Sequence, residues 1–143
     1  MTQGVEVVGL YVRDQDEALT FYVEKLGFRV HTDVRNGDYR WLTVRVPGGE
    51  STEISLEQPG PPLHDEATAE QIRELITKGA LGGLVFITDD ARALYDTLRE
   101  RGVTDFTQEP IDHFYGTDMG LRDPFGNAIR ILERKAAPAQ ASA

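Results

Sequence analysis

The sequence repeats itself at a separation of 75 positions, and this repeat constrains the fold more than any other feature. Asp14 and Asp89 occupy equivalent places, and so do Gly27 and Gly102. In each copy a short apolar run precedes the aspartate. Apolar residues at helical spacing then continue as far as the glycine. Two copies of one supersecondary unit therefore fill the chain.

Each copy is predicted to form a strand, a helix and three further strands. In the first copy we expect a strand over 5–12, a helix ending at Gly27, strands over 28–34, 40–46 and 53–57, and turns at Asn36-Gly37 and Pro47-Gly48-Gly49. In the second we expect a strand over 84–88, a helix ending at Gly102, and strands over 104–108, 119–122 and 128–133. The predicted fold class is α+β, with two βαβββ modules. Helices on one face of each curved mixed sheet leave the other faces free to enclose a cavity.

The length of 143 residues suits one compact domain. We expect a single domain over 1–134, with module one at about 4–58, a connection at about 59–80 and module two at about 81–134. The connection opens on Pro59-Gly60-Pro61-Pro62, which breaks regular structure, and is expected to hold one short helix. The segment 135–143 has no pattern and is expected to be a mobile tail.

The composition excludes several classes of function. The chain has no cysteine, which removes thiolate nucleophiles, disulfides and cysteine-ligated zinc. Its formal net charge of −9 argues against a nucleic acid partner, because phosphate binding needs clustered lysine and arginine. No run approaches the roughly 18 apolar residues of a membrane span, and no basic signal-peptide region opens the chain. We therefore expect a cytoplasmic protein without a membrane or nucleic acid partner.

Several segments carry a resemblance to a known family, and they are Gly9–Asp14, Phe21–Phe28, Leu84–Asp90, Arg101–Val103 and Tyr115–Asn127. The last of them ends in the turn Asp-Pro-Phe-Gly-Asn. Together they resemble the vicinal oxygen chelate superfamily, which holds glyoxalase I, extradiol dioxygenases, and fosfomycin- and bleomycin-resistance proteins. The resemblance covers about Val5 to Glu133 and implies the βαβββ repeat and a homodimer.

In metal-dependent members of that superfamily, side chains from the first and last strands of both modules hold one divalent metal. The resemblance places these positions on Val7, Glu53, Gly83 and Arg130. Only Glu53 can bind a metal, whereas a catalytic site normally keeps three protein ligands. A guanidinium in the shell would also repel a divalent cation. We therefore expect no metal and no other cofactor.

Glu53 and Arg130 are predicted to face the cavity from the two modules. A carboxylate and a guanidinium can pair through two hydrogen bonds, so the pair is a candidate replacement for the metal. Two alternatives stay open: the pair satisfies only itself, or one or both groups contact a polar ligand.

Aromatic residues are the other candidates for ligand binding. Trp41 and Arg45 share a strand face, while the apolar residues between them are expected to face the helices, so both should face the cavity. Tyr11 is expected to share that orientation. An aromatic ring there can stack on a flat ligand or a cation, and packing between the modules is the alternative.

The three histidines show no metal-ligand spacing. His31 is expected at the end of a strand and His64 in solvent. His113 precedes Tyr115 in a predicted loop over the cavity mouth, and by elimination it is the candidate general base. An ordinary loop histidine is the alternative.

These observations favour metal-independent binding of a small organic molecule in the inter-module cavity, similar to the bleomycin-resistance proteins. The candidate ligand-binding residues are Tyr11, Trp41, Arg45, Glu53, His113, Tyr115 and Arg130. One alternative is a glyoxalase-like lyase or isomerase, or a dioxygenase, that uses a divergent divalent metal site or acid–base chemistry. Another is an interaction module that keeps the fold without a ligand.

Overall fold

The computed structural model describes residues 1–48 and 52–135, and it divides the chain into two compact units. The first unit holds Met1–Leu81 together with the turn Pro124–Asn127. The second holds Gly82–Asp123 and the chain from Ala128 onward. The predicted connection at 59–80 thus belongs to the first unit. The predicted tail lies outside the described residues except for its first residue.

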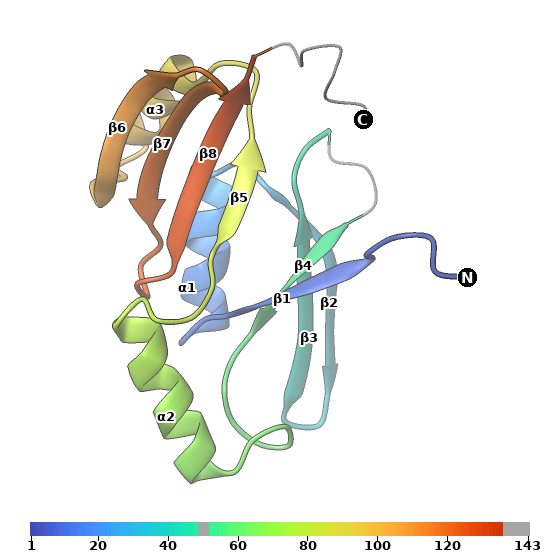
Figure 1. The fold of residues 1–143 in the computed structure, drawn as a ribbon. Coiled ribbons are helices and arrows are strands. Elements are labelled where there is room, and N and C mark those ends of the chain that lie inside the picture. Colours follow the sequence, from blue (N-terminus) through green and yellow to red (C-terminus); the bar gives the residue numbers. More distant parts are fainter. Residues whose placement is uncertain (49–51, 136–143) are drawn as a thin grey trace. The chain divides into compact units, whose positions relative to one another are not determined.

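The first unit contains a four-stranded sheet and three helical segments (Figure 1). Its elements are β1 (Val7–Tyr11), α1 (Gln15–Leu19), η1 (Thr20–Lys25), β2 (Arg29–Asn36), β3 (Tyr39–Arg45), β4 (Glu53–Glu57) and α2 (Glu66–Thr77). The strands lie in the order β1-β4-β3-β2, with β1 parallel to β4 and the other neighbours antiparallel. The predicted α+β class is confirmed in this unit, including the short helix of the connection.

The first helix begins and ends where the sequence indicates. The Asp14 side chain caps it by accepting a hydrogen bond from the amide of Glu17 at 2.9 Å. Gly27 follows its end with a φ of 82°, a left-handed conformation that glycine adopts without a steric penalty. The prediction of one regular α-helix is wrong in its second half, because α1 continues into the π-helical η1.

The β2–β3 hairpin turns one residue later than predicted. Asn36 pairs with Tyr39, so the two loop residues are Gly37 and Asp38. Gly37 has a φ of 63°, and the first loop residue of a type II′ turn requires a positive φ. The predicted turn at 47–49 is described only at its first two residues, and Gly49 lies outside the described residues.

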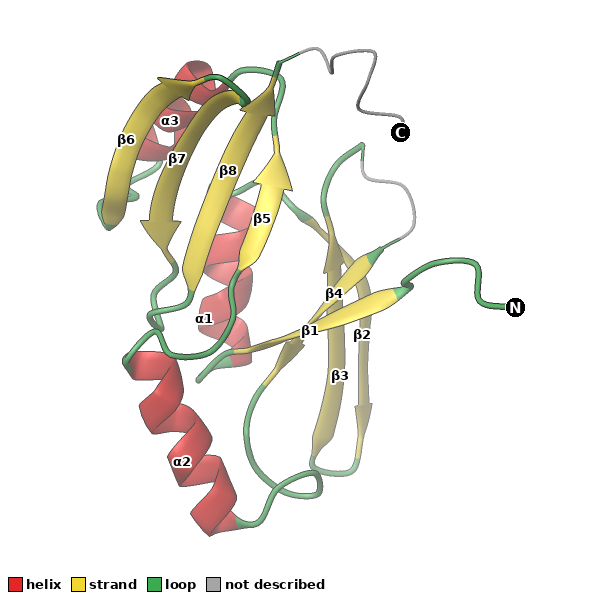
Figure 2. Ribbon diagram, in the orientation of Figure 1, coloured by secondary structure: helices red, strands yellow, loops and turns green. Residues whose placement is uncertain are grey.

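The second unit repeats this plan with one sheet and one described helix (Figure 2). Its elements are β5 (Leu84–Ile87), α3 (Ala91–Glu100), β6 (Phe106–His113), β7 (Gly116–Arg122) and β8 (Ala128–Arg134). The strand order β5-β8-β7-β6 matches that of the first sheet, with β5 parallel to β8. Asp90 caps α3, and Gly102 follows its end with a φ of 90°. Within 1–48 and 52–135, no helix is long and apolar enough to cross a membrane.

β6 is longer than predicted, because it continues from Gln108 through Pro110 to His113. Proline is tolerated there since β6 is an edge strand whose ladder with β7 is irregular at this point. His113 pairs with Gly116 at the end of the strand. Its predicted position in a loop is therefore wrong.

Each sheet has one buried apolar face, and the opposite face, which we call the open face, carries polar and aromatic side chains of which Thr43, Glu53 and Ser55 are buried on the first sheet. On the buried face of the first sheet the apolar residues alternate along the strands, and they are Leu10, Leu42, Val44, Ile54 and Leu56. The second sheet buries Met119, Leu121, Ile129 and Ile131 in the same way. Full burial of such a side chain stabilises the fold by about 1.5–3 kcal/mol. The alternation leaves the polar and aromatic residues of both sheets on the open faces.

The turn that carried the family resemblance packs within the first unit. Asn127 is buried, and its Nδ2 donates a hydrogen bond to the carbonyl oxygen of Tyr11 at 2.8 Å. Gly126 has a φ of 111°, and a β-carbon there would lie 2.7 Å from the carbonyl oxygen of Ile76. Both the conformation and the close approach require glycine. The motif therefore has a structural role beside the end of β1.

Candidate functional site

The open face of the first sheet gathers polar and aromatic side chains. They come from β1, β3 and β4 and are Tyr11, Tyr39, Trp41, Thr43, Arg45, Glu53, Ser55 and Glu57. Parallel pairing sets Tyr11 beside Glu57, and antiparallel pairing sets Thr43 beside Ser55. Trp41 and Arg45 flank Thr43 on the same face of β3, and both are half-buried.

Glu53 is the centre of one cluster on this face. Its Oε1 accepts a hydrogen bond of 2.6 Å from Thr43 and lies 2.8 Å from Nδ1 of His31. Its Oε2 lies 3.7 Å from Nη2 of Arg45. The hydrogen bond from Thr43 is the main reason that the pKa of Glu53 lies below its usual value, and it outweighs burial, which acts in the opposite direction. Glu53 is therefore an ionised, well-bonded carboxylate at neutral pH.

His31 reaches this cluster because of a β-bulge. The register of β2 against β3 shifts between Val30 and Thr32, so His31 is the extra residue of β2. Bulges change the direction in which a side chain points. The expectation that His31 ends a strand is wrong, and its contact with Glu53 follows from the irregular ladder.

Tyrosines and a histidine surround Glu57 at the other end of the open face. The Tyr39 hydroxyl donates a hydrogen bond to Glu57 at 3.1 Å. The Tyr11 hydroxyl lies 3.3 Å from Nε2 of His64, and the two rings meet edge to face at 5.7 Å. His64 is half-buried by this contact, so the expectation of a solvated histidine is wrong.

A pocket of 390 Å³ lies against this end of the sheet. It is lined by Gly9, Leu10, Tyr11, Ser55, Glu57 and Leu63. A β-carbon on Gly9 would lie 3.5 Å from the Ser55 hydroxyl, which is an ordinary contact. The absence of a side chain at Gly9 therefore enlarges the pocket, although the backbone there would also accommodate alanine.

The open face of the second sheet has a cluster of its own, centred on Asp118. Asp118 Oδ2 lies 2.6 Å from Nη2 of Arg130 and 3.2 Å from the Tyr115 hydroxyl, while Oδ1 lies 3.1 Å from Nε2 of His113. The rings of His113 and Tyr115 stack at 4.9 Å. Burial alone would raise the pKa of Asp118, but hydrogen bonds from Arg130 and Gln108 hold it below its usual value. Burial and the Asp118 charge raise the pKa of Tyr115.

Gly120 makes room for the guanidinium of Arg130. The two residues pair across β7 and β8. A β-carbon on Gly120 would lie 2.7 Å from Nη1 of Arg130 and 2.5 Å from the Thr107 hydroxyl. The missing side chain therefore allows Arg130 to lie across β7 and reach Asp118.

The residues at the family's metal positions do not fit a divalent ion. Val7 has no donor, and Glu53 is already bonded to Thr43 and His31. Arg130 pairs in register with Val85, which is apolar, rather than with Gly83. Within the described parts of the chain, no group of three or more histidine, aspartate or glutamate side chains is placed to hold a metal.

The structure brings the candidate residues together in two sets. Arg45 meets Glu53 on the first sheet, and His113, Tyr115 and Arg130 meet on the second. Glu53 and Arg130 each form their ion pairs within their own sheet, so neither charge needs the other as a partner. The cavity expected between the modules stays a prediction.

Sequence reasoning missed four members of these clusters, which are His31, Thr43, Gln108 and Asp118. Asp118 precedes the predicted strand 119–122, so its face was not considered. Extending that strand by one residue would have placed Asp118 on the same face as Gly120, which is the face of Arg130. No pattern in the sequence indicates the bulge at His31.

The sequence and the fold match one family. The family model described as the Glyoxalase/Bleomycin resistance protein/Dioxygenase superfamily matches residues 4–131. The chain belongs to this superfamily, as the resemblance implied.

Solved structures and curated relatives are similar over nearly the whole chain. UcmS2 is 41% identical, with a TM-score of 0.87, over 93% of this chain and 99% of its own. TnmS3, an antibiotic binding protein from Streptomyces sp. CB03234, is 30% identical, with a TM-score of 0.73, over 94% and 98%. YurT of Bacillus subtilis (strain 168), an uncharacterized protein, is 37% identical over 91% of this chain and 98% of its own.

Proposed function

We propose that this chain binds a small organic molecule of the antibiotic class on the open face of the first sheet, without a metal. The observation that carries the proposal is the pocket of 390 Å³ beside Tyr11 and Glu57. Sites for small molecules usually measure about 300–1,000 Å³ and combine apolar walls with a few polar groups. This pocket has both kinds of wall.

The chemistry of the face suits a flat organic ligand. Tyr11 and Leu63 supply apolar surface, and Ser55 and Glu57 supply hydrogen-bonding groups. Trp41 stands on the same face, two positions along β3 from the Thr43–Ser55 pair. An aromatic ring in this place can stack on a planar ligand or contact a cation.

The relatives support the same class of ligand. TnmS3 is an antibiotic binding protein, and a second protein from Streptomyces sp. CB03234, a glyoxalase/bleomycin resistance protein, is 31% identical over 91% of this chain. Metal independence rests on the unsuitable residues at the family's metal positions.

A binding titration tests the proposal. The chain has one tryptophan, so Trp41 fluorescence reports on this face without a label. Chelator-treated protein is titrated with bleomycin and with a set of planar aromatic antibiotics. We expect saturable quenching by at least one compound, and weaker binding by Tyr11→Ala. The matched control is Tyr95→Ala on α3, which should leave the affinity unchanged.

A second candidate function is acid–base catalysis, and one observation favours it. His113 Nε2 lies 3.1 Å from a buried carboxylate of Asp118, an arrangement that orients a histidine general base. Under this alternative, His113→Gln abolishes a turnover that Tyr11→Ala leaves intact. A catalytic screen of the two variants separates the candidates.

A further inference from the structure

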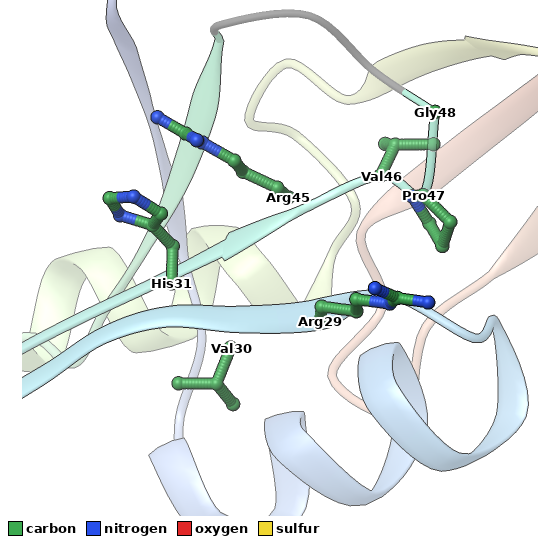
Figure 3. A pocket seen from close by; sticks show the side chains of 7 residues that line it. All are labelled: Arg29, Val30, His31, Arg45, Val46, Pro47 and Gly48. Atoms are coloured by element: carbon green, nitrogen blue, oxygen red, sulfur yellow. The ribbon is translucent and has the colours of Figure 1, made fainter.

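A second pocket lies at the opposite end of the first sheet, near the Glu53 cluster. Its volume is 310 Å³, and its lining includes the basic side chains of Arg29, His31 and Arg45. The remaining lining residues are Val30, Val46, Pro47 and Gly48. Figure 3 shows the His31 and Arg45 side chains on one side of the two strands and Val30 on the other. The described wall of the pocket therefore holds basic groups and no acidic one.

The two arginines lie opposite each other, because Arg29 and Arg45 pair in register across β2 and β3. Like charges placed directly opposite on a sheet destabilise it. The side chain of Arg29 forms no hydrogen bond or ion pair with any residue in 1–48 or 52–135. A bound anion would remove the repulsion and give Arg29 a partner.

Arg45 also has unused binding capacity. Its contact with Glu53 is 3.7 Å, longer than the 2.7–2.9 Å of a charge-assisted hydrogen bond. Its Nε is buried without an acceptor among the described residues. Glu53 does not line the pocket, and its short contacts are with Thr43 at 2.6 Å and His31 at 2.8 Å.

We propose that Arg29, Arg45 and His31 form an oxyanion-binding site for a carboxylate, phosphate or sulfate group. Guanidinium groups match such anions because two parallel N–H donors meet two oxygens. The volume of 310 Å³ exceeds that of one small ion, since one water takes about 30 Å³. The site thus has room for a free oxyanion or for the acidic group of an organic molecule. It does not depend on the proposed function, because a free anion can fill it whether or not the pocket beside Tyr11 is occupied.

The test is an NMR titration of the full chain with inorganic phosphate, following the backbone amide signals of residues 29–31, 45, 46 and 48. We expect saturating shifts with a Kd on the order of 1 mM. Arg29→Gln should weaken phosphate binding about tenfold, a loss typical of one charge-assisted contact. Arg29→Lys should weaken it less, since it keeps the charge. Arg35→Gln, an exposed position on the same strand, is the matched control and should bind phosphate as the parent does.

Two organic probes distinguish the sources of the anion. If 1-naphthoate binds more tightly than phosphate and phosphate displaces it, the site takes an organic acid. If phosphate alone binds, the site takes a free oxyanion. The proposal is overturned if phosphate shifts no signal to saturation, if Arg35→Gln weakens binding as much as Arg29→Gln, or if uncharged 1-naphthalenemethanol binds as well as 1-naphthoate. Circular dichroism of every variant verifies that the fold is intact.

Discussion

The Nδ1 of His31 lies 2.8 Å from Oε1 of Glu53, and this contact exists because a bulge turns residue 31 toward the open face of the first sheet. The position at which the family resemblance implied a metal-binding carboxylate therefore already has partners among the side chains of its own sheet. The electrostatics of Glu53 give the first prediction.

Glu53 should make the stability of the chain fall in acid. Its folded pKa lies below the usual value, so its contribution is fully present above the unfolded pKa and is lost as pH falls through the folded pKa. Glu53→Gln should lower the free energy of unfolding by about 1–2 kcal/mol at pH 7 and by little at pH 3. Urea unfolding at both pH values measures this. An equal loss at the two values would contradict it.

Arg130 should keep Asp118 ionised. In Arg130→Gln the pKa of Asp118 should rise, because burial raises this pKa and the positive charge that lowers it is removed. Arg130 is partly exposed, so the loss of stability at pH 7 should be moderate, about 1–2 kcal/mol. An NMR titration of the Asp118 carboxyl measures the pKa. Arg134→Gln, at an exposed position on the same strand, should leave it unchanged.

Substitution by alanine should lower the stability of the fold at Gly83 but not at Gly82. A β-carbon on Gly83 would overlap the carbonyl oxygen of Ala128, whereas one on Gly82 would meet nothing within 4 Å. Gly83→Ala should cost about 3 kcal/mol, because backbone must move. Gly82→Ala should change stability by no more than about 0.5 kcal/mol. Thermal unfolding of the two variants measures this difference. Equal unfolding midpoints would contradict the close approach of Gly83 to the Ala128 carbonyl oxygen.

Gly9→Ala should separate stability from ligand binding. The new methyl group would lie 3.5 Å from the Ser55 hydroxyl, so the fold should tolerate it within about 0.5 kcal/mol. The same methyl group would narrow the pocket beside Tyr11, and we expect ligand affinity to fall by about tenfold. Thermal unfolding measures the stability of Gly9→Ala and of the parent protein, and a fluorescence titration measures their ligand affinities. Unchanged affinity would place the ligand elsewhere.

The parts of the fold that depend on local chemistry could be predicted from the sequence. Asp14 marks the start of the first helix and Gly27 its end. Both signals are local, because a carboxylate cap and a left-handed glycine affect only the few residues beside them. The alternation along β3 likewise separated buried Leu42 and Val44 from half-buried Trp41.

The parts that depend on neighbouring strands could not be predicted. The bulge at His31 and the irregular ladder at Pro110 arise from pairing between strands, which one strand's sequence does not encode. Gly83 was considered as a metal-ligand position, whereas a β-carbon there would overlap the backbone of Ala128 on the neighbouring strand. The Asp118 cluster was missed because the predicted strand began one residue too late to include it.

We propose that this chain binds an organic ligand on its first sheet without a metal. The most direct measurement is the titration of chelator-treated protein with antibiotics, followed by Trp41 fluorescence and repeated with nickel, manganese, iron and zinc salts. We expect saturable binding with an affinity that none of these metals changes, and we expect no metal to be retained at one per chain. Binding that appears only with a retained metal, and is lost together with that metal in Glu53→Ala, would contradict it.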